Sequence, residues 1–126
     1  MATARFSFRT EHKSTYVMNP EPRHSKEFIF ELTDDKLIKH ARALLAGTAS
    51  HEGHVGGRIV HKKADYNPAF SFHLDPSTIY FFDTEIEVRD AEPEYVEDHI
   101  DDAGGAFLPG KQWAPWASRI IREIKI

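Results

Sequence analysis

Histidine and aspartate side chains stand at spacings that metal-binding and acid–base sites use. His51 and His54 lie three residues apart beside a glycine, and His73 precedes Asp75 by two residues. Zinc needs three or four ligands that converge on one point, so His51, His54 and His73 are the candidate metal ligands. Residues two apart on a strand point the same way, so Asp75 can also orient His73 as a general base. These residues define an alternative, a small metal- or His/Asp-dependent hydrolase or isomerase; the plainer interpretation is a polar loop with surface histidines.

Polar residues also frame the segment 70–74 at both of its ends. Asn67 and Asp75 each precede a proline, and His73 lies between them. A functional interpretation places Asn67, His73 and Asp75 around a shallow binding pocket. The structural interpretation is turn formation, because Asn and Asp before proline hydrogen-bond locally and begin turns.

Carboxylates gather in the second half of the chain. Paired carboxylates can act as acid and base, or bind calcium, but the sequence contains no EF-hand loop. The solvated faces of a strand and a helix explain them more simply. The sequence also lacks a cysteine nucleophile, a Gly-x-Ser-x-Gly elbow and a phosphate-binding glycine loop. We therefore expect no cofactor, with zinc or calcium as the only candidates. The clustered acids are Asp83, Glu85, Glu87, Asp90, Glu94, Glu97, Asp98, Asp101 and Asp102.

Residues 107–116 form an aromatic segment that contains two tryptophans and two prolines. Stiff loops of this composition suit protein recognition, because tryptophan offers a large contact area at a small entropic cost. The alternative is that both indoles fill the core beneath a long connection. The candidate binding residues of the whole chain are Asn67, His73, Asp75, Leu108, Trp113 and Trp116.

The composition argues against several classes of function. The 126 residues carry a formal net charge of −4, which does not favour binding to nucleic acid. No run of about 18 apolar residues could span a membrane, and no apolar signal-peptide core stands near residue 1. The chain has no cysteine, which fits a reducing compartment. We therefore expect a cytoplasmic protein without a nucleic-acid or membrane partner.

The elements that must position these residues follow from the apolar periodicity. Alternation of apolar and polar residues predicts strands, and apolar residues three and four apart predict helices. The pattern indicates an α+β fold, a mostly antiparallel sheet of five to six strands with two helices packed on one face, in a single domain over residues 1–126. The predicted strands are 4–8, 27–32, 55–61, 70–74, 79–82, 85–89 and 119–126. The predicted helices are 34–46 and 93–103, and residues 10–26 are a predicted mobile loop.

An ordered series of motifs resembles one bacterial and amoebal family. That family is named after the amino-terminal domain of an amoebal calmodulin-binding protein of seventy-four kilodaltons. The resemblance runs from about residue 28 to residue 126, and the order of its motifs is specific. The motifs are His-Val-Gly-Gly-Arg-Ile-Val at 54–60, Tyr-Asn-Pro at 66–68, Phe-Ser-Phe-His-Leu-Asp-Pro at 70–76, Phe-Phe at 81–82, Tyr-Val-Glu-Asp-His at 95–99, Gly-Gly-Ala-Phe-Leu-Pro-Gly at 104–110 and Trp-x-Pro-Trp-x-Ser-Arg at 113–119.

The resemblance implies a binding role, since the namesake is described as binding calmodulin, and it carries over no catalytic residues. It also implies cysteines at the positions that Arg89 and Ala114 occupy in this chain. If those cysteines form a bridge in relatives, this chain has lost it.

The sequence therefore predicts a non-enzymatic binding module for a protein partner, either calmodulin-binding-like or peptidase-inhibitor-like. A calmodulin target needs a basic amphipathic helix, which Lys36, Lys39 and Arg42 match in part. We do not favour that route, because the helix should bury its apolar stripe. An inhibitor would use the loop 108–116. The strand at 119–126 could pair with a second copy, so we expect a monomer or a homodimer.

Overall fold

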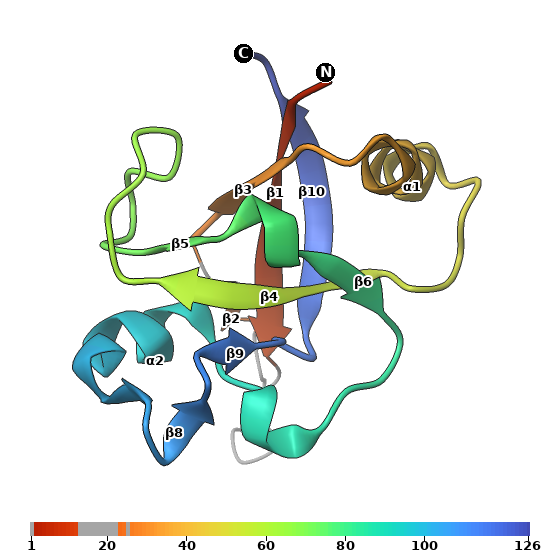
Figure 1. Cartoon of the computed structure of the whole chain (residues 1–126). Coiled ribbons are helices and arrows are strands. Elements are labelled where there is room, and N and C mark those ends of the chain that lie inside the picture. Colours follow the sequence, from red (N-terminus) through yellow and green to blue (C-terminus); the bar gives the residue numbers. More distant parts are fainter. Residues whose placement is uncertain (1, 13–22, 25) are drawn as a thin grey trace.

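The computed structural model describes residues 2–12, 23–24 and 26–126, and Figure 1 shows their arrangement. The longer strands are β1 (Ala4–His12), β3 (Phe28–Leu32), β4 (His54–Val60) and β10 (Ser118–Ile124). The shorter strands are β2 (Arg23–His24), β5 (His73–Leu74), β6 (Tyr80–Phe82), β7 (Ala103–Gly104), β8 (Phe107–Pro109) and β9 (Gln112–Trp113). The α-helices are α1 (Asp35–Ala46) and α2 (Pro93–Asp98), and short 3-10 helices are η1 (Pro76–Thr78), η2 (Glu87–Arg89) and η3 (Ile100–Asp102).

The first sheet is built around β1. Its neighbours β3 and β10 pair with it antiparallel, and β2 pairs with its last residues. In this register Phe6 lies opposite Phe30, and Phe8 lies opposite Phe28. The alternation of the sequence therefore places these four phenyl rings on one buried face.

The second sheet is built around β4, which crosses in front of β1 and β10 in Figure 1. β4 pairs antiparallel with β5, β6 and β9 along different parts of its length. A side chain at Gly56 would collide with its neighbours, because its Cβ would lie 3.0 Å from the Tyr80 ring and 3.1 Å from Ala114 Cβ. Glycine is therefore what allows the β6 side and the segment after β9 to close over β4.

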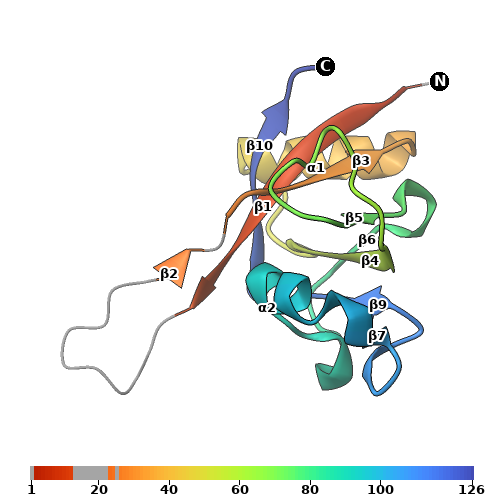
Figure 2. The same cartoon turned by 90° about the vertical axis from the view of Figure 1, so that its left-hand side faces the viewer.

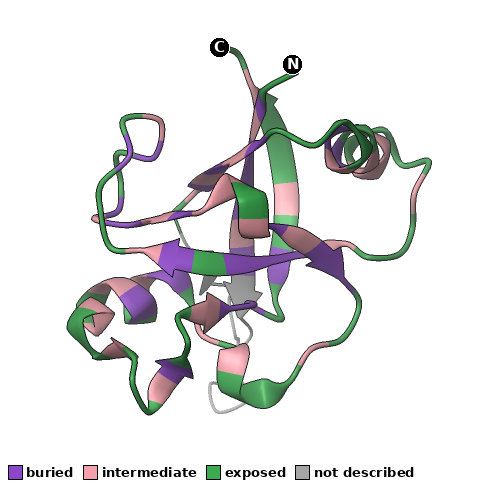
Figure 3. Ribbon diagram, in the orientation of Figure 1, coloured by how far each residue is buried: buried purple, intermediate pink, exposed green. Residues whose placement is uncertain are grey.

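Aromatic rings from both sheets meet in one hydrophobic core. The Trp113 ring is fully buried, with its centroid 5.8 Å from that of Phe8, 5.2 Å from Phe28 and 5.6 Å from Phe72. Figure 3 shows buried residues along β1, β3 and β4, where the two sheets face each other. The second sheet thus contributes the indole that fills the space between the layers.

Helix α1 confirms the first predicted helix, with its start one residue later. Asp34 is the cap, because its carboxylate accepts hydrogen bonds from the backbone N–H groups of Lys36 and Leu37. Gly47 ends the helix in the left-handed conformation, with φ 77°. Ile38 and Ala41 are the buried residues of α1, and the helix contacts β10 and β3.

The α+β class and the mostly antiparallel pairing are confirmed, but the single sheet of five to six strands is wrong. The strands are divided between two four-stranded sheets and a two-stranded parallel pair, β7 with β8. Figures 1 and 2 place α1 and α2 at opposite ends of the molecule, so they do not share one face. Sequence periodicity could not predict this division, because it depends on which distant strands pair with β4.

Three local predictions also need correction. The strand predicted at 70–74 is reduced to His73–Leu74, because a turn links the Phe70 N–H to the Asn67 carbonyl. The strand predicted at 85–89 is the 3-10 helix η2 with the residues before it. The second helix ends at Asp98 and continues as η3.

The loop predicted at 10–26 overlaps regular structure at both ends. β1 extends through His12, and β2 covers Arg23–His24. The rest of that prediction, residues 13–22 and 25, lies outside the described residues.

Candidate protein-binding face

The three histidines predicted to bind metal do not converge. His54 pairs with Phe82 at one end of β4, whereas His73 pairs with Val60 at the other end. His54 Nδ1 lies 2.7 Å from the Ser118 carbonyl, and His51 is exposed in a bend. Within the part of the chain that the structure describes, no group of three or more His, Asp or Glu side chains could hold a metal ion. The trio His51, His54 and His73 is therefore wrong as a metal site.

His73 and Asp75 each make a local structural contact. His73 Nδ1 lies 2.6 Å from the Lys62 carbonyl oxygen. The Asp75 carboxylate instead caps η1, accepting from the Ser77 N–H at 3.0 Å and the Ser77 hydroxyl at 2.8 Å. These two hydrogen bonds hold the pKa of Asp75 below its ordinary value. The pair is thus engaged in turn geometry of the kind that the proline spacing favours.

Asn67 is buried and links the two sheets. Its side-chain oxygen accepts from the Ile29 N–H of β3 at 2.9 Å, and its amide nitrogen donates to the Phe72 carbonyl at 3.0 Å. The side chain is fully excluded from solvent. Asn67 is therefore positioned to hold the fold together, and a partner on the surface could not contact it.

The aromatic segment divides between core and surface. Leu108 and Trp113 are buried, and the Trp113 indole N–H donates to the Ala91 carbonyl at 2.8 Å. Trp116 is 42% exposed. Of the two interpretations of this segment, the core one holds for Leu108 and Trp113, and only Trp116 is left as a surface anchor.

Trp116 lies beside a second exposed apolar segment. Its N–H donates to the Asp90 carboxylate at 2.8 Å, and it lines a pocket of about 280 Å³ with Asp83, Thr84 and Glu85. The segment 83–90 also carries Ile86 and Val88, which are 55% and 59% exposed. We call Trp116, Ile86 and Val88 the Trp116 face. Sequence reasoning missed the two aliphatic members, because their alternation was interpreted as a buried strand.

A polar network fixes the segment beneath the Trp116 face. The Tyr80 hydroxyl donates to the Glu85 carboxylate, and Arg89 Nη1 donates to the same carboxylate oxygen at 3.0 Å. The hydrogen bond from Tyr80 is the main reason that the pKa of Glu85 lies below its ordinary value. Burial, with that hydrogen bond, raises the pKa of Tyr80. The segment is therefore anchored to β6 by its side chains.

The two positions at which the resemblance implies cysteines lie side by side. The Ala114 N–H donates to the Arg89 carbonyl at 2.7 Å. A backbone hydrogen bond therefore joins the segment 83–90 to the Trp-Pro segment at this point, in a chain that has no cysteine to bridge them.

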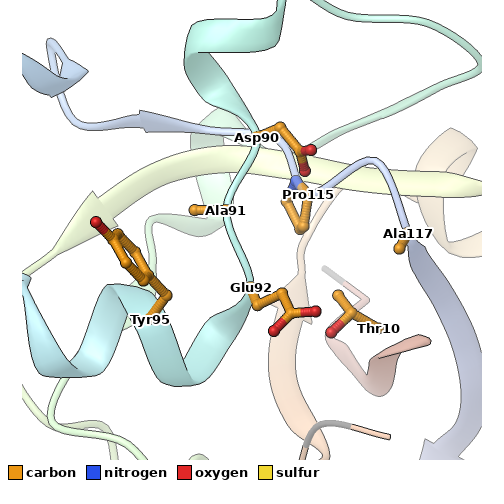
Figure 4. Close-up of a pocket in the computed structure, with 7 residues that line it drawn as sticks. All are labelled: Thr10, Asp90, Ala91, Glu92, Tyr95, Pro115 and Ala117. Carbon is orange, nitrogen blue, oxygen red and sulfur yellow. The ribbon is translucent and has the colours of Figure 1, made fainter. Parts of the chain in front are cut away.

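A larger pocket lies on the other side of the connection that carries Trp116. It has a volume of about 440 Å³ and is lined by backbone and side chains from four segments (Figure 4). Two carboxylates and the half-exposed Tyr95 ring give it polar character, and alanine and proline complete its wall. The lining residues are Thr10, Asp90, Ala91, Glu92, Tyr95, Pro115 and Ala117.

Negative charge surrounds both pockets. Residues 83–102 hold ten of the 20 acidic residues of the chain but only one of its 16 basic residues, Arg89. A concentration of one charge sign steers partners of opposite sign and repels those of like sign. The surface next to Trp116 therefore favours a basic partner.

The described part of the molecule is thus an α+β domain of two facing sheets, whose exposed apolar residues adjoin an acidic segment. Comparison with protein families gives its place. The family model for the N-terminal domain of the seventy-four-kilodalton binding protein matches residues 3–126, so the chain belongs to that family. This confirms the resemblance drawn from the motifs. No curated protein and no solved structure shows a significant match. Among the described helices, none is long and apolar enough to cross a bilayer.

Proposed function

We propose that this domain is a protein-binding module that contacts its partner through the Trp116 face. The observation that supports this proposal is the exposure of Trp116, Ile86 and Val88 on two adjoining segments. Single exposed apolar residues are common, but a large aromatic residue beside a pocket and two exposed aliphatic residues is typical of interaction surfaces. Membership in a family that is named after a binding protein fits this role.

The anchoring of the segment favours tight recognition by Trp116. Its backbone is held by Asp90, and its neighbours Pro115 and Trp113 are buried. A side chain presented from a fixed backbone loses little conformational entropy on binding. Tryptophan anchors of this kind contribute about 2 kcal/mol or more to an interface.

The calmodulin-binding-like form of the proposal finds less support. The apolar side of α1 packs in the core through Ile38 and Ala41, and Arg42 pairs with Glu123 of β10 at 3.0 Å. The helix would have to leave the domain to enter the groove of calmodulin, whose targets are basic amphipathic helices. The acidic surroundings of the Trp116 face lack the charge of such a target.

The other candidate functions depend on fewer exposed residues. A peptidase-inhibitor-like role would be confined to the exposed residues 109–111, because Leu108 and Trp113 are buried. The hydrolase or isomerase alternative depended on His73 and Asp75, whose contacts are with Lys62 and Ser77. The Trp116 face is therefore the surface on which we base the function.

Affinity capture with matched variants tests this proposal. We expect Trp116→Ala and Ile86→Ser to lose the proteins that the unaltered domain captures from an extract of its host. The control is Ile126→Ser, which makes the same change at an exposed isoleucine outside the face. Captures with calcium and with a chelator would show whether calcium matters.

The outcome has meaning only for folded variants, so thermal unfolding of each is measured first. If folded Trp116→Ala and Ile86→Ser capture the same proteins as the Ile126→Ser control, the Trp116 face is not the interface and the proposal is wrong.

A further inference from the structure

We propose that the larger pocket, between Asp90, Glu92 and Tyr95, receives an arginine side chain of the protein partner. This inference rests on the proposed function, and it adds the chemistry of the partner. The pocket adjoins the Trp116 face, because Asp90 binds the Trp116 N–H and Pro115 lines the pocket wall. A partner that covers Trp116 would therefore extend a neighbouring side chain into it.

Two carboxylates supply the charge that a guanidinium needs. Asp90 and Glu92 line the pocket, and Figure 4 shows their carboxylates on either side of Pro115. The Asp90 carboxylate is fixed by the Trp116 N–H at 2.8 Å. Charge-assisted hydrogen bonds to carboxylates are roughly twice as strong as neutral ones, and the planar guanidinium can donate to more than one acceptor.

Tyr95 offers a ring face for the same cation. One face of the ring is stacked on His99, with centroids 4.0 Å apart and planes 20° apart. Phe107 packs edge-on at 5.4 Å, so the ring is held from two sides. Tyr95 is nevertheless 51% exposed and lines the pocket. A cation can therefore approach the face that His99 leaves uncovered, and a guanidinium over an aromatic face is attracted by its quadrupole.

The rest of the lining fits the aliphatic stem of arginine. Ala91, Pro115 and Ala117 form the apolar part of the wall. Arginine buries its methylene groups along apolar surface while its charged end binds elsewhere. A pocket with both kinds of wall suits such a side chain better than it suits a purely apolar one.

The donor set favours an organic cation over a metal ion. Calcium takes six to eight oxygen ligands, whereas the described residues contain no group of three or more acidic or histidine side chains able to hold a metal. Arg89, the single basic residue of 83–102, is engaged by Glu85. The charge of this segment is thus left to be complemented by a partner.

A titration of the whole domain followed by amide NMR tests the inference. The probes are the peptide acetyl-Leu-Arg-Gly-Leu-amide and the same peptide with citrulline, which keeps the shape of arginine but lacks its charge. We expect the arginine peptide to shift the amide signals of Asp90, Ala91 and Tyr95 saturably, with an affinity at least about tenfold above that of the citrulline peptide. Higher salt should weaken it.

Charge-neutral variants locate the effect. Glu92→Gln keeps the shape of the side chain and should reduce the affinity for the arginine peptide severalfold. Glu87→Gln makes the same charge change at an exposed residue outside the pocket, so it should leave the affinity nearly unchanged. Tyr95→Leu should weaken binding more than Tyr95→Phe, because phenylalanine keeps the ring face.

Three results would overturn the inference: equal binding of the citrulline peptide, equal effects of Glu92→Gln and Glu87→Gln, or saturable shifts of the same signals by calcium chloride alone. Its failure is distinguishable from failure of the proposed function. If Trp116→Ala abolishes partner capture while Glu92→Gln does not, the Trp116 face stands and the arginine pocket falls.

Discussion

Trp113 and Trp116 lie three residues apart and belong to two regions with opposite properties. Trp113 packs against Phe8, Phe28 and Phe72 between the two sheets and directs its N–H to a backbone carbonyl. Trp116 is held through its backbone N–H, and its ring borders a pocket on the surface. One short segment therefore contributes both to the core and to the candidate interface, and the buried indole fixes the position of the exposed one.

The largest expected effect separates the two tryptophans by stability. Trp113→Ala should lower the free energy of unfolding by about 3 to 5 kcal/mol, because it leaves a cavity between the sheets. Trp116→Ala should change it by no more than about 0.5 kcal/mol, since its side chain is largely at the surface. Urea unfolding followed by circular dichroism measures both. Similar losses for the two variants would show that Trp116 also belongs to the core.

The sequence predicted the elements whose signals are local. Phe6 and Phe8 in β1, and Phe28 and Phe30 in β3, alternate in a pattern that only a half-buried strand explains. Gly47 ended α1 where its conformational freedom predicted. The division into two sheets was not predictable, because pairing with β4 is decided by contacts between residues far apart in the sequence.

The candidate site was predictable only in part. The composition of residues 107–116 indicated a recognition segment, but nothing in it distinguishes the buried Trp113 from the exposed Trp116. The alternation of Ile86 and Val88 resembles a strand, although both are exposed. His73 and Asp75 stood at a catalytic spacing, yet their bonds to Lys62 and Ser77 come from turns that spacing does not reveal.

A smaller effect is expected at the close approach that joins the two regions. In Gly56→Ala the new methyl group would lie 3.0 Å from the Tyr80 ring and 3.1 Å from Ala114 Cβ. Such overpacking should lower the free energy of unfolding by about 1 to 3 kcal/mol. Gly53→Ala is the matched control, because its Cβ would meet no heavy atom within 4 Å. Denaturant midpoints of the two variants compare them; equal midpoints would mean that β6 and the Trp116 connection shift without cost.

The smallest expected effect concerns the network that supports the Trp116 face. The pKa of Glu85 is held below its ordinary value of 4.5, first by the Tyr80 hydroxyl and further by the Ile86 N–H and Arg89. Because the folded state depresses this pKa, the stabilisation from Glu85 is present above the pKa of the unfolded chain. It is lost as the pH falls through the lower, folded value.

Carboxyl NMR titrations of the folded domain and of the domain in urea measure this shift. We expect the Glu85 midpoint to be lower in the folded state, and Tyr80→Phe to move it back toward the unfolded value, because the largest cause is removed. Arg89→Gln should move it less. Acidification should also broaden or shift the signals of Ile86 and Trp116 before the core residues respond. If the Glu85 midpoint is the same in both states, the network does not anchor the segment, and the rigidity that we assign to the Trp116 face must come from Asp90 and Pro115 alone.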